Sequence, residues 1–528
     1  MTLEPVLIAG LWRQANHPSG SFTAHDPSKK VPLPEQYPIS GSEDVEAALQ
    51  AARQAVTDLR SHSAGEIADF LELYASKIDA HARDLVAMAN LETALPIEPR
   101  LRSSELPRTT NQLRQAAAAV RDRSWRRATI DTKPNIRSIY GPLGGPVVVF
   151  GPSNFPFAFN SISGGDFAAA IAAGNPVLAI ANPGYPGTTR LFAGLMLEAL
   201  LESGLPSGLV QLIYQVPPEL GLKLVAHPLV GATGFTGSRK SGMNLKGAAD
   251  KAGKPIYLEM SSVNPVFILT GALKERLASV AAELYSSCAL GAGQFCTKPG
   301  LTILLDNEDS QAFEQEVKRL FATNPPGILL GPGSPKIIEH AIQVLVEHGA
   351  EVVTGGWEAS SAGYSFENTL LRVSGDTFLQ NPQALQSEAF GTVNLMVFAR
   401  DPNQMLQIAS GLEGNLTGSV YSDTQGKDDS LYGQLEPILR QKVGRLLNDK
   451  MPTGVAVVSA MNHGGPFPAT GHPGFTSVGM PASLLRFAAL WSYDNVRQGR
   501  LPPELQNKNP TGKMWRFIDG EWTQKDIA

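Results

Sequence analysis

Cysteine is scarce in this chain, since only Cys288 and Cys296 occur among 528 residues. Seven residues separate the two, which matches no zinc-ligand spacing and gives no disulfide framework. None of the nine histidines falls in a spacing such as His-Glu-x-x-His, so we expect no metal. The sequence therefore predicts a protein of a reducing compartment, the cytoplasm.

Strong net charge and long apolar runs are also missing. The net charge is −5 and the pI is about 6.0, which argues against nucleic acid or an anionic membrane as a partner. No apolar run reaches the roughly 18 residues that cross a bilayer. No basic stretch followed by an apolar one opens the chain, so we expect no signal peptide.

What the chain does have is a regular alternation of short apolar segments and amphipathic ones. A hydrophobic content of 43% over this length predicts two or three domains. Strands are expected at "GPVVVF", "PVLAIA", "LVQLIY", "GATGFTG", "PVFILT", "GLTILL", "EVVTG", "VNLMVF" and "GSVYS". Helices are expected over residues 43–60, 65–90, 111–121, 272–290 and 310–321. This order predicts an α/β fold with right-handed crossovers and parallel sheets.

Cys296 lies in a loop that glycines interrupt. The helical stretch before it ends at "GAGQFCTKPG", where Gly291 and Gly293 break the helix. A thiol at such a loop tip is accessible to substrate and can receive backbone N–H donors, as a nucleophile needs. A lone cysteine is more often a small buried residue.

Two further segments supply partners for that thiol. "KPIYLEM" ends a strand on Glu259, at the edge of the sheet where α/β enzymes keep their chemistry. "PVVVFGPSNFPF" ends a second strand before Asn154. Considered alone, Glu259 is more simply explained as a solvated residue at a strand end, and Asn154 as a turn residue. Together with Cys296 they supply a general base and an oxyanion donor for thiol-based acyl chemistry.

These motifs resemble those of the aldehyde dehydrogenase superfamily. Glu-x-x-Ser-x-Asn-Pro at 259–265 and Gly-Gln-x-Cys at 293–296 occur in the family order, and the resemblance runs from about residue 10 to about residue 500. "FGPSNFPFAFNSISGGDFAAAIAAGNPV", "HGGPFPAT" and "FTSVG" are most similar to the branch of α-ketoglutarate semialdehyde (2,5-dioxovalerate) and NADP-dependent fatty aldehyde dehydrogenases.

The resemblance implies a fold and a domain plan. It implies two Rossmann-type parallel α/β domains plus a small β oligomerisation arm, and a homodimer or homotetramer. The implied boundaries are 1–122 and 143–264 for the dinucleotide-binding domain, 265–480 for the catalytic domain, 123–142 and 481–500 for the arm, and 501–528 for a C-terminal extension. Within that extension, "FIDGEWTQ" echoes "LIAGLWRQ" of residues 7–14, so we consider a second hairpin there beside a coincidence.

An NAD or NADP site is implied by the same resemblance. Gly237, Ser238 and Gly242 follow a strand and open a helix whose N-terminus favours phosphates, although neither a P-loop nor Gly-x-Gly-x-x-Gly is present. Glu388 in "SEAFGTVN" corresponds to the ligand of the nicotinamide ribose, and Phe390 to the residue beside the ring.

The chain departs from its relatives at the adenosine end of that site. Ile180 stands where the family carries a ribose-binding lysine. A lost charge-assisted contact weakens binding by roughly 1.5–3 kcal/mol unless something compensates. Asn182 is a candidate ribose ligand, and Arg239 or Lys240 a candidate phosphate ligand. The choice between NAD and NADP stays open.

The predicted reaction is oxidation of an aldehyde to a carboxylic acid through a cysteine thiohemiacetal and thioester. The branch favours α-ketoglutarate semialdehyde, giving 2-oxoglutarate, but that substrate needs a carboxylate clamp that the sequence does not reveal. Phe159 and Phe295 are the expected pocket residues, and their apolar character favours a medium- or long-chain fatty aldehyde. Two interpretations from different classes also stay open: a non-catalytic binding protein of this fold, and a cysteine hydrolase.

Overall fold

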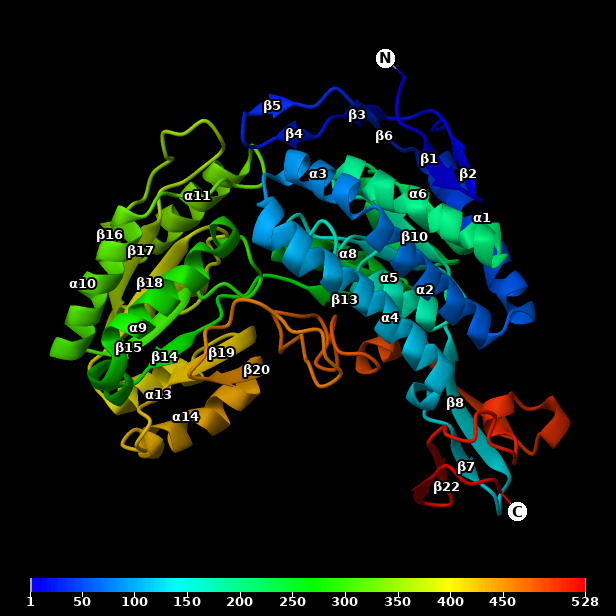
Figure 1. The fold of residues 1–528 in the computed structure, drawn as a ribbon. Coiled ribbons are helices and arrows are strands. Elements are labelled where there is room, and N and C mark those ends of the chain that lie inside the picture. Colours follow the sequence, from blue (N-terminus) through cyan, green and yellow to red (C-terminus); the bar gives the residue numbers. More distant parts are fainter. Residues whose placement is uncertain (1, 528) are drawn as a thin grey trace.

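The computed structural model describes residues 2–527 and consists of two α/β lobes and a protruding β arm (Figure 1). Each lobe is built on a seven-stranded sheet, and the arm on a five-stranded one. This confirms the predicted α/β class with two parallel sheets. Two small pairs complete the strands: β3 (Gly20–Phe22) with β6 (Tyr37–Ile39), and β4 (His25–Asp26) with β5 (Val31–Pro32).

The first lobe has the strand order β13-β12-β9-β10-β11-β1-β2, in which the first five strands are parallel. Its central strands are almost wholly buried because helices cover both faces, which explains their unbroken apolar sequences. The strands are β1 (Val6–Ile8), β2 (Leu11–Arg13), β9 (Val147–Phe150), β10 (Val177–Ile180), β11 (Val210–Ile213), β12 (Ala232–Thr236) and β13 (Ile256–Glu259).

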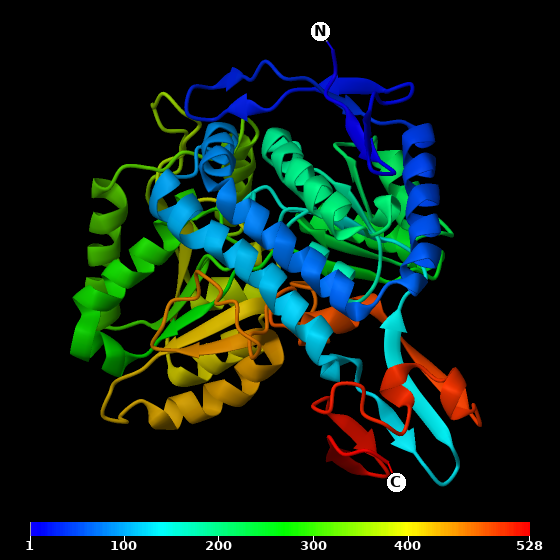
Figure 2. The ribbon, with the colours of Figure 1, turned by 45° about the vertical axis from the view of Figure 1, so that its right-hand side comes forward.

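Eight α-helices belong to this part of the chain. They are α1 (Ser42–Asp58), α2 (Ala64–Ala80), α3 (Ala82–Thr93), α4 (Leu106–Asp122), α5 (Gly165–Ala172), α6 (Pro186–Ser203), α7 (Pro218–Val225) and α8 (Arg239–Lys251). The single helix expected over 65–90 is wrong, because the backbone leaves the helical region at His81 (φ −106°, ψ 21°). α4 begins five residues earlier than expected and crosses the lobe diagonally, ending beside the arm (Figure 2).

The second lobe has the order β16-β17-β18-β15-β14-β19-β20, and only β16 is antiparallel. Two of its strands, β17 and β20, are absent from the sequence prediction. The strands are β14 (Val266–Ile268), β15 (Leu301–Leu305), β16 (Glu351–Thr354), β17 (Thr369–Ser374), β18 (Val393–Ala399), β19 (Asn415–Tyr421) and β20 (Val443–Asn448). The helices are α9 (Thr270–Ala289), α10 (Glu308–Thr323), α11 (Ser334–Glu347), α12 (Gly375–Gln380), α13 (Pro402–Ser410) and α14 (Asp429–Lys442).

The arm joins segments that are far apart in the sequence. Its order is β21-β8-β7-β22-β23, where β8 (Ile136–Pro142) pairs along its whole length with β21 (Ala488–Asp494). The C-terminal strand β22 (Arg516–Ile518) lies parallel to β7 (Thr129–Asp131) and turns back into β23 (Glu521–Thr523). The C-terminal segment is therefore part of the arm sheet.

The echo between the two ends of the chain corresponds to two real hairpins. β1 and β2 pair Leu7 with Trp12, and β22 and β23 pair Phe517 with Trp522. Both turns have two residues with positive φ, Ala9-Gly10 and Asp519-Gly520, as two-residue hairpins require. The predicted second hairpin is thus confirmed.

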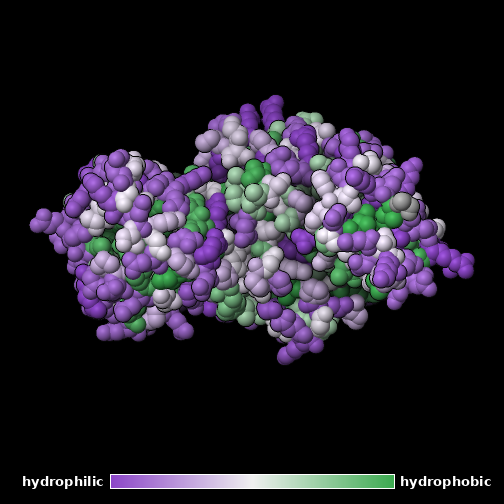
Figure 3. All heavy atoms as spheres, turned by 90° about the horizontal axis from the view of Figure 1, so that it is seen from below, coloured by the Kyte–Doolittle hydropathy of each residue, from purple (hydrophilic) through white to green (hydrophobic). Residues whose placement is uncertain are grey.

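The surface is mainly hydrophilic on the face seen from below, and its hydrophobic residues form separate patches (Figure 3). Within residues 2–527, no helix is both long enough and apolar enough to span a bilayer.

Candidate active site

Cys296 sits in the connection from α9 to β15, on a loop that packs against backbone. Gly291 and Gly293 have φ of +58° and +72° there. A Cβ on Gly293 would lie 2.1 Å from the carbonyl carbon of Gly391, so no other residue fits. This close approach holds the Cys296 loop against the segment that carries Glu388.

Asn264 fixes the loop from the other side. Its Nδ2 donates to the backbone oxygens of Cys296 (2.8 Å) and Lys298 (2.9 Å). The backbone of Asn264 adopts φ 49°, and its own N–H donates to Oδ1 of Asn415 at 3.0 Å. The asparagine of the Glu-x-x-Ser-x-Asn-Pro motif therefore positions the thiol and does not contact it directly.

Glu259 ends β13 and is 1% exposed. Its Oε1 is 2.8 Å from Nε2 of His463, and its Oε2 accepts a 3.0 Å hydrogen bond from Ser477. Burial raises the pKa of Glu259, but the charge and hydrogen bond of His463 and the Ser477 hydroxyl outweigh it, so the pKa lies below its usual value. A buried carboxylate is therefore held in its ionised form.

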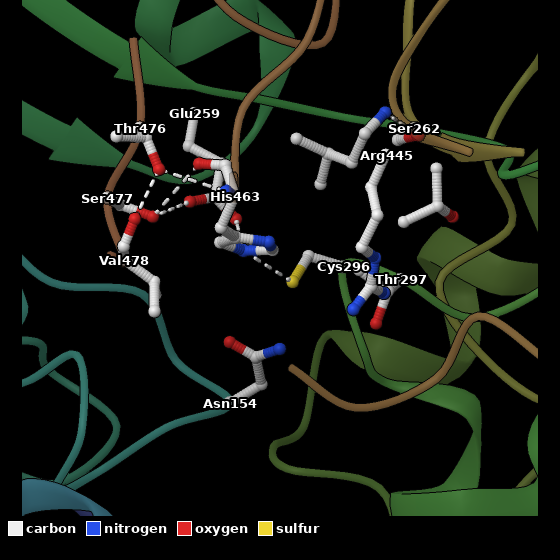
Figure 4. A network of polar contacts seen from close by, with 12 residues as sticks. Asn154, Glu259, Ser262, Cys296, Thr297, Arg445, His463, Thr476, Ser477 and Val478 are labelled. Carbon is white, nitrogen blue, oxygen red and sulfur yellow. Dashed lines mark hydrogen bonds and ion pairs between the residues drawn. The ribbon is translucent and has the colours of Figure 1, made fainter. Parts of the chain in front are cut away.

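His463 is the functional residue that the sequence analysis missed. Its Nε2 is 3.5 Å from the sulfur of Cys296, and Figure 4 shows the ring between that sulfur and Glu259. It is 2% exposed, the only buried histidine of the nine, all of which fall within residues 2–527. The sequence signal that could have identified it is the motif "HGGPFPAT", which begins with His463 and was used only as support for the family resemblance.

The thiol itself is held in its protonated form. Burial and the negative charge of Glu259 raise the pKa of Cys296 well above its usual value, while the charge of Arg108 acts in the opposite direction. The sulfur, the imidazole and the carboxylate therefore form one cluster with ligand atoms within 4.8 Å of one another. Such a spacing also suits a metal ion, but the 2.8 Å hydrogen bond between His463 and Glu259 places a proton there instead. The absence of a metal stays a prediction.

Asn154 approaches the thiol from the end of β9 and is 5% exposed. One of its amide hydrogens goes to the backbone oxygen of Gln294 at 2.9 Å, and its own backbone oxygen accepts from Arg100 at 2.9 Å. Its side chain faces the sulfur from a separate segment (Figure 4). The second amide hydrogen is free to donate to an oxyanion on a carbon bound to that sulfur.

An aromatic cluster lies next to these residues. The ring of Phe155 is 5.2 Å from those of both Phe159 and Phe295, and the ring of Phe159 is 5.8 Å from that of His463. Phe155 and Phe295 line a cavity of about 860 Å³. Of the two expected pocket residues, Phe295 lines this cavity, and Phe159 packs on the catalytic histidine. Phe155 was not predicted.

The expected phosphate segment opens α8. The hydroxyl of Ser238 caps the helix by accepting from the backbone N–H of Ser241 at 3.3 Å, which is the ordinary role of serine there. The N–H of Gly237 donates to the backbone oxygen of Glu259 at 3.1 Å. A Cβ on Gly242 would lie 3.0 Å from the sulfur of Met260, so this glycine lets α8 pack closely.

Glu388 lines a second cavity, of about 220 Å³, together with Arg239 at the start of α8 and Ser262. Burial raises the pKa of Glu388 to about 7, although Ser261, Lys298 and the backbone of Ser262 lower it. Phe390 is half-buried two residues further on. A carboxylate acceptor and the positive end of a helix thus share one cavity, a donor set that fits the ribose and phosphates of a dinucleotide.

The adenosine end of the expected site fits less well. Ile180 is 5% exposed and belongs to the core of the first lobe. Asn182 donates to the backbone oxygen of Gly151 at 3.0 Å and accepts from the N–H of Gly184 at 2.9 Å, so its amide already braces two turns. Arg239 pairs with Glu413 at 2.9 Å. Lys240, the other candidate phosphate ligand, is exposed at the start of α8, and its role stays a prediction.

A thiol beside an imidazole and a carboxylate fits nucleophilic catalysis, and comparison with known proteins decides the class of enzyme, an oxidoreductase acting on aldehydes. The aldehyde dehydrogenase family model matches residues 12–437, and the chain belongs to that family. It is 38% identical over 517 residues to α-ketoglutaric semialdehyde dehydrogenase 2 of Azospirillum brasilense, which covers 95% of this chain and 96% of that protein. It is also 38% identical to α-ketoglutaric semialdehyde dehydrogenase of Acinetobacter baylyi, covering 91% and 92%.

Solved structures show the same fold. A variant of 1-pyrroline-5-carboxylate dehydrogenase from Thermus thermophilus has a TM-score of 0.80 at 22% identity, covering 93% of this chain and 92% of that one. Aldehyde dehydrogenase C of Pseudomonas syringae, solved with NAD+ and octanal, has a TM-score of 0.80 at 19% identity, covering 95% and 98%. Use of NAD or NADP is consistent with this family.

Proposed function

We propose that this protein oxidises α-ketoglutarate semialdehyde to 2-oxoglutarate with NAD+ or NADP+ and releases the free acid. The observation that carries the proposal is the cluster of Cys296, His463 and Glu259 with Asn154 beside it. The two relatives at 38% identity are named for this activity, and the similarity extends over nearly their whole length.

The reaction begins at the thiol. Glu259 accepts the proton of Cys296, and the thiolate adds to the aldehyde carbon to form a thiohemiacetal. The amide of Asn154 and the backbone N–H of Cys296 stabilise the oxyanion. A nicotinamide held beside the thiohemiacetal would supply the hydride acceptor, and loss of the hydride would leave a thioester on Cys296. Glu259 first passes that proton through His463 to solvent and then takes a proton from water; the hydroxide equivalent adds to the thioester carbon, and the acid leaves as its bond to the sulfur of Cys296 breaks.

His463 has a role in both halves of this reaction, thioester formation and hydrolysis. It lies 2.8 Å from the carboxylate and 3.5 Å from the sulfur, so one nitrogen can pass a proton to either group. By lowering the pKa of Glu259 it keeps this buried base ionised. We assign it the role of a proton carrier between nucleophile and base.

For the cofactor we propose that Gly237, Ser238 and Gly242 lie beside the phosphates and that Glu388 binds the nicotinamide ribose, with Phe390 beside the ring. The cavity that Arg239 and Glu388 share supports this. Asn182 stays a candidate for the adenosine ribose only if it exchanges its two present hydrogen bonds for new ones.

A medium- or long-chain fatty aldehyde is the second candidate substrate. The cavity of about 860 Å³ favours it, because much of its lining is apolar: Leu95, Phe155, Leu290, Phe295, Ile328 and Val455. The intact catalytic cluster argues against a non-catalytic binding protein.

We also propose the domain boundaries given above, except that residues 501–528 belong with the arm because β22 and β23 are part of its sheet, together with a cytoplasmic location and a homo-oligomer that uses the arm. The arm exposes Leu490, Trp491, Trp515 and Trp522, with exposed fractions between 38% and 61%, and exposed apolar side chains on a projecting sheet favour association. A single monomer mass in light scattering would contradict the oligomer.

The first test follows reduced nicotinamide by its absorbance, with α-ketoglutarate semialdehyde and saturating NAD+ or NADP+ in parallel. We expect turnover, a loss of about 10⁴-fold or more in Cys296→Ala, and full activity in the matched control Cys288→Ala. Turnover that survives in Cys296→Ala would remove the nucleophile assignment. No turnover with this or fatty aldehydes, together with no dinucleotide binding, would favour a non-catalytic binding protein.

A further inference from the structure

Arg108 lies in the first turn of α4 and lines the cavity of about 860 Å³. Its guanidinium carbon is 5.3 Å from the ring centre of Phe155 and 5.1 Å from that of Phe159. One of these rings, Phe159, also packs on His463. The charges of Cys296 and Glu259 act on the pKa of Arg108, which burial lowers. A fixed positive charge therefore borders the reacting thiol.

The guanidinium of Arg108 has an unsatisfied edge. Its Nε and Nη2 are both shielded from solvent, and neither has a hydrogen-bond partner among residues 2–527. These two nitrogens form the side edge of the guanidinium, which presents two parallel N–H donors at the spacing of carboxylate oxygens. Leaving charged donors buried and unpaired is costly, so these two donors need a partner that completes their hydrogen bonds, and on the wall of a cavity that partner is a water molecule or a ligand.

The nearest carboxylate cannot complete them. Oε1 of Glu105 accepts from the backbone N–H groups of Phe157 and Ala158, each at 2.9 Å, and Oε2 is taken by Arg100. Arg100 also donates from Nη2 to the backbone oxygen of Asn154, which leaves its Nε as a single unpaired donor. Glu105 is therefore committed to holding the oxyanion segment.

A second guanidinium near the thiol provides the contrast. The charge of Cys296 also acts on Arg445, whose burial lowers its pKa. However, Arg445 donates to the backbone oxygens of Pro452 at 2.7 Å and Gly454 at 3.1 Å. Its terminal donors are bonded to the loop that it holds, and Arg100 has only Nε unpaired, so Arg108 is the guanidinium at this site with two adjacent unpaired donors.

We propose that Arg108 is the carboxylate-binding residue of the aldehyde site, its Nε and Nη2 donating to the two oxygens of an anionic group at the far end of the substrate. This inference rests on the proposed function and decides between its two candidates. The phenylalanine walls hold the methylene carbons, and the guanidinium selects a short aldehyde that ends in a carboxylate. A fatty aldehyde would leave the donors unpaired.

The test compares α-ketoglutarate semialdehyde with pentanal, which has the same number of carbons and no charge. For Arg108→Met we expect kcat/KM with the semialdehyde to fall by about 10- to 100-fold, mainly through KM, because a charge-assisted pair is lost. Activity with pentanal should stay the same or rise. Arg108→Lys should retain part of the activity, since lysine supplies the charge without the fork. Arg114→Met, an exposed position of α4 that pairs with Asp79, is the matched control.

Equal losses with both aldehydes would show a structural role, and no loss with the semialdehyde would place its carboxylate elsewhere; either result overturns the inference. A second measurement separates this inference from the proposed function. Calorimetry of 2-oxoglutarate with Cys296→Ala, with and without Arg108→Met, needs no turnover. Binding that Arg108→Met abolishes supports the carboxylate site even if the semialdehyde is not oxidised, whereas binding that survives, or no binding at all, overturns it.

Discussion

The two cysteines, eight positions apart, have opposite surroundings. Cys288 ends α9 in the apolar core of the second lobe, where its thiol donates to the backbone oxygen of Pro299 at 3.3 Å and burial raises its pKa to about 12. The pKa of Cys296 is also raised, but there a carboxylate adds to the effect of burial. A high thiol pKa therefore does not distinguish a structural cysteine from a nucleophile. The distinction is the presence of a group that can take the proton.

The largest change is expected when that group is removed. In Glu259→Gln, turnover should fall by about 10²- to 10⁴-fold, because no carboxylate accepts the proton of Cys296 or activates water. The pKa of Cys296 should fall at the same time, since the negative charge that raises it is gone. Iodoacetamide should then alkylate Cys296 faster at neutral pH than in the unaltered protein. Slower alkylation would mean that Glu259 activates the thiol more than it suppresses ionisation.

An intermediate effect is expected from His463→Gln. His463 lowers the pKa of Glu259, so its removal should raise that pKa. Because the carboxylate is the active form, the acidic limb of the kcat profile should move to higher pH, with about a tenfold or greater loss in kcat at neutral pH. His472→Gln is the control, since His472 is exposed on the same loop and packs on Tyr257. A lower kcat with an unmoved profile would reduce His463 to a packing role.

The smallest effect on activity is expected from Cys288→Ala. The change removes one buried atom from a core in which Cys288 is fully buried, so the free energy of unfolding in urea should fall by about 1 kcal/mol while kcat stays the same. Titration of native protein with a thiol reagent should still find one reactive thiol per chain. Loss of that thiol in Cys288→Ala would contradict the assignment of the two cysteines.

The sequence predicted the fold and three of the four residues that the structure brings together at the candidate site, because these depend on local pattern. Apolar runs mark the strands, and Cys296, Glu259 and Asn154 each follow a strand or helix that the pattern predicts. His463 lies in a stretch without regular structure, 204 residues from Glu259, and only the folded chain brings the two together. Arg108 was missed for a related reason: on a charged amphipathic helix, nothing local separates an arginine without a partner from Arg114, which has one.

Asn182 shows the opposite case, in which the sequence suggests a binding residue whose side chain is already hydrogen-bonded in the fold. Its type and position suit a ribose ligand, but its amide already makes two hydrogen bonds to backbone. Similarly, β22 and β7 pair in parallel, but each strand has only three residues, which is too short to show a clear alternation of apolar and polar side chains. Hydrogen-bond commitments and long-range pairings are properties of the whole fold.

The arm has a consequence for how the protein is made. The N–H of Thr132 at the end of β7 donates to Asp519, 387 residues later in the chain. At about 5–20 residues per second, a ribosome needs roughly 20–80 s to cover that distance. During this interval β7 is an open edge on which another nascent chain can add a strand. Nascent chains that stall before residue 516 keep this edge, so the demand for chaperones should peak late in synthesis and end when β22 emerges.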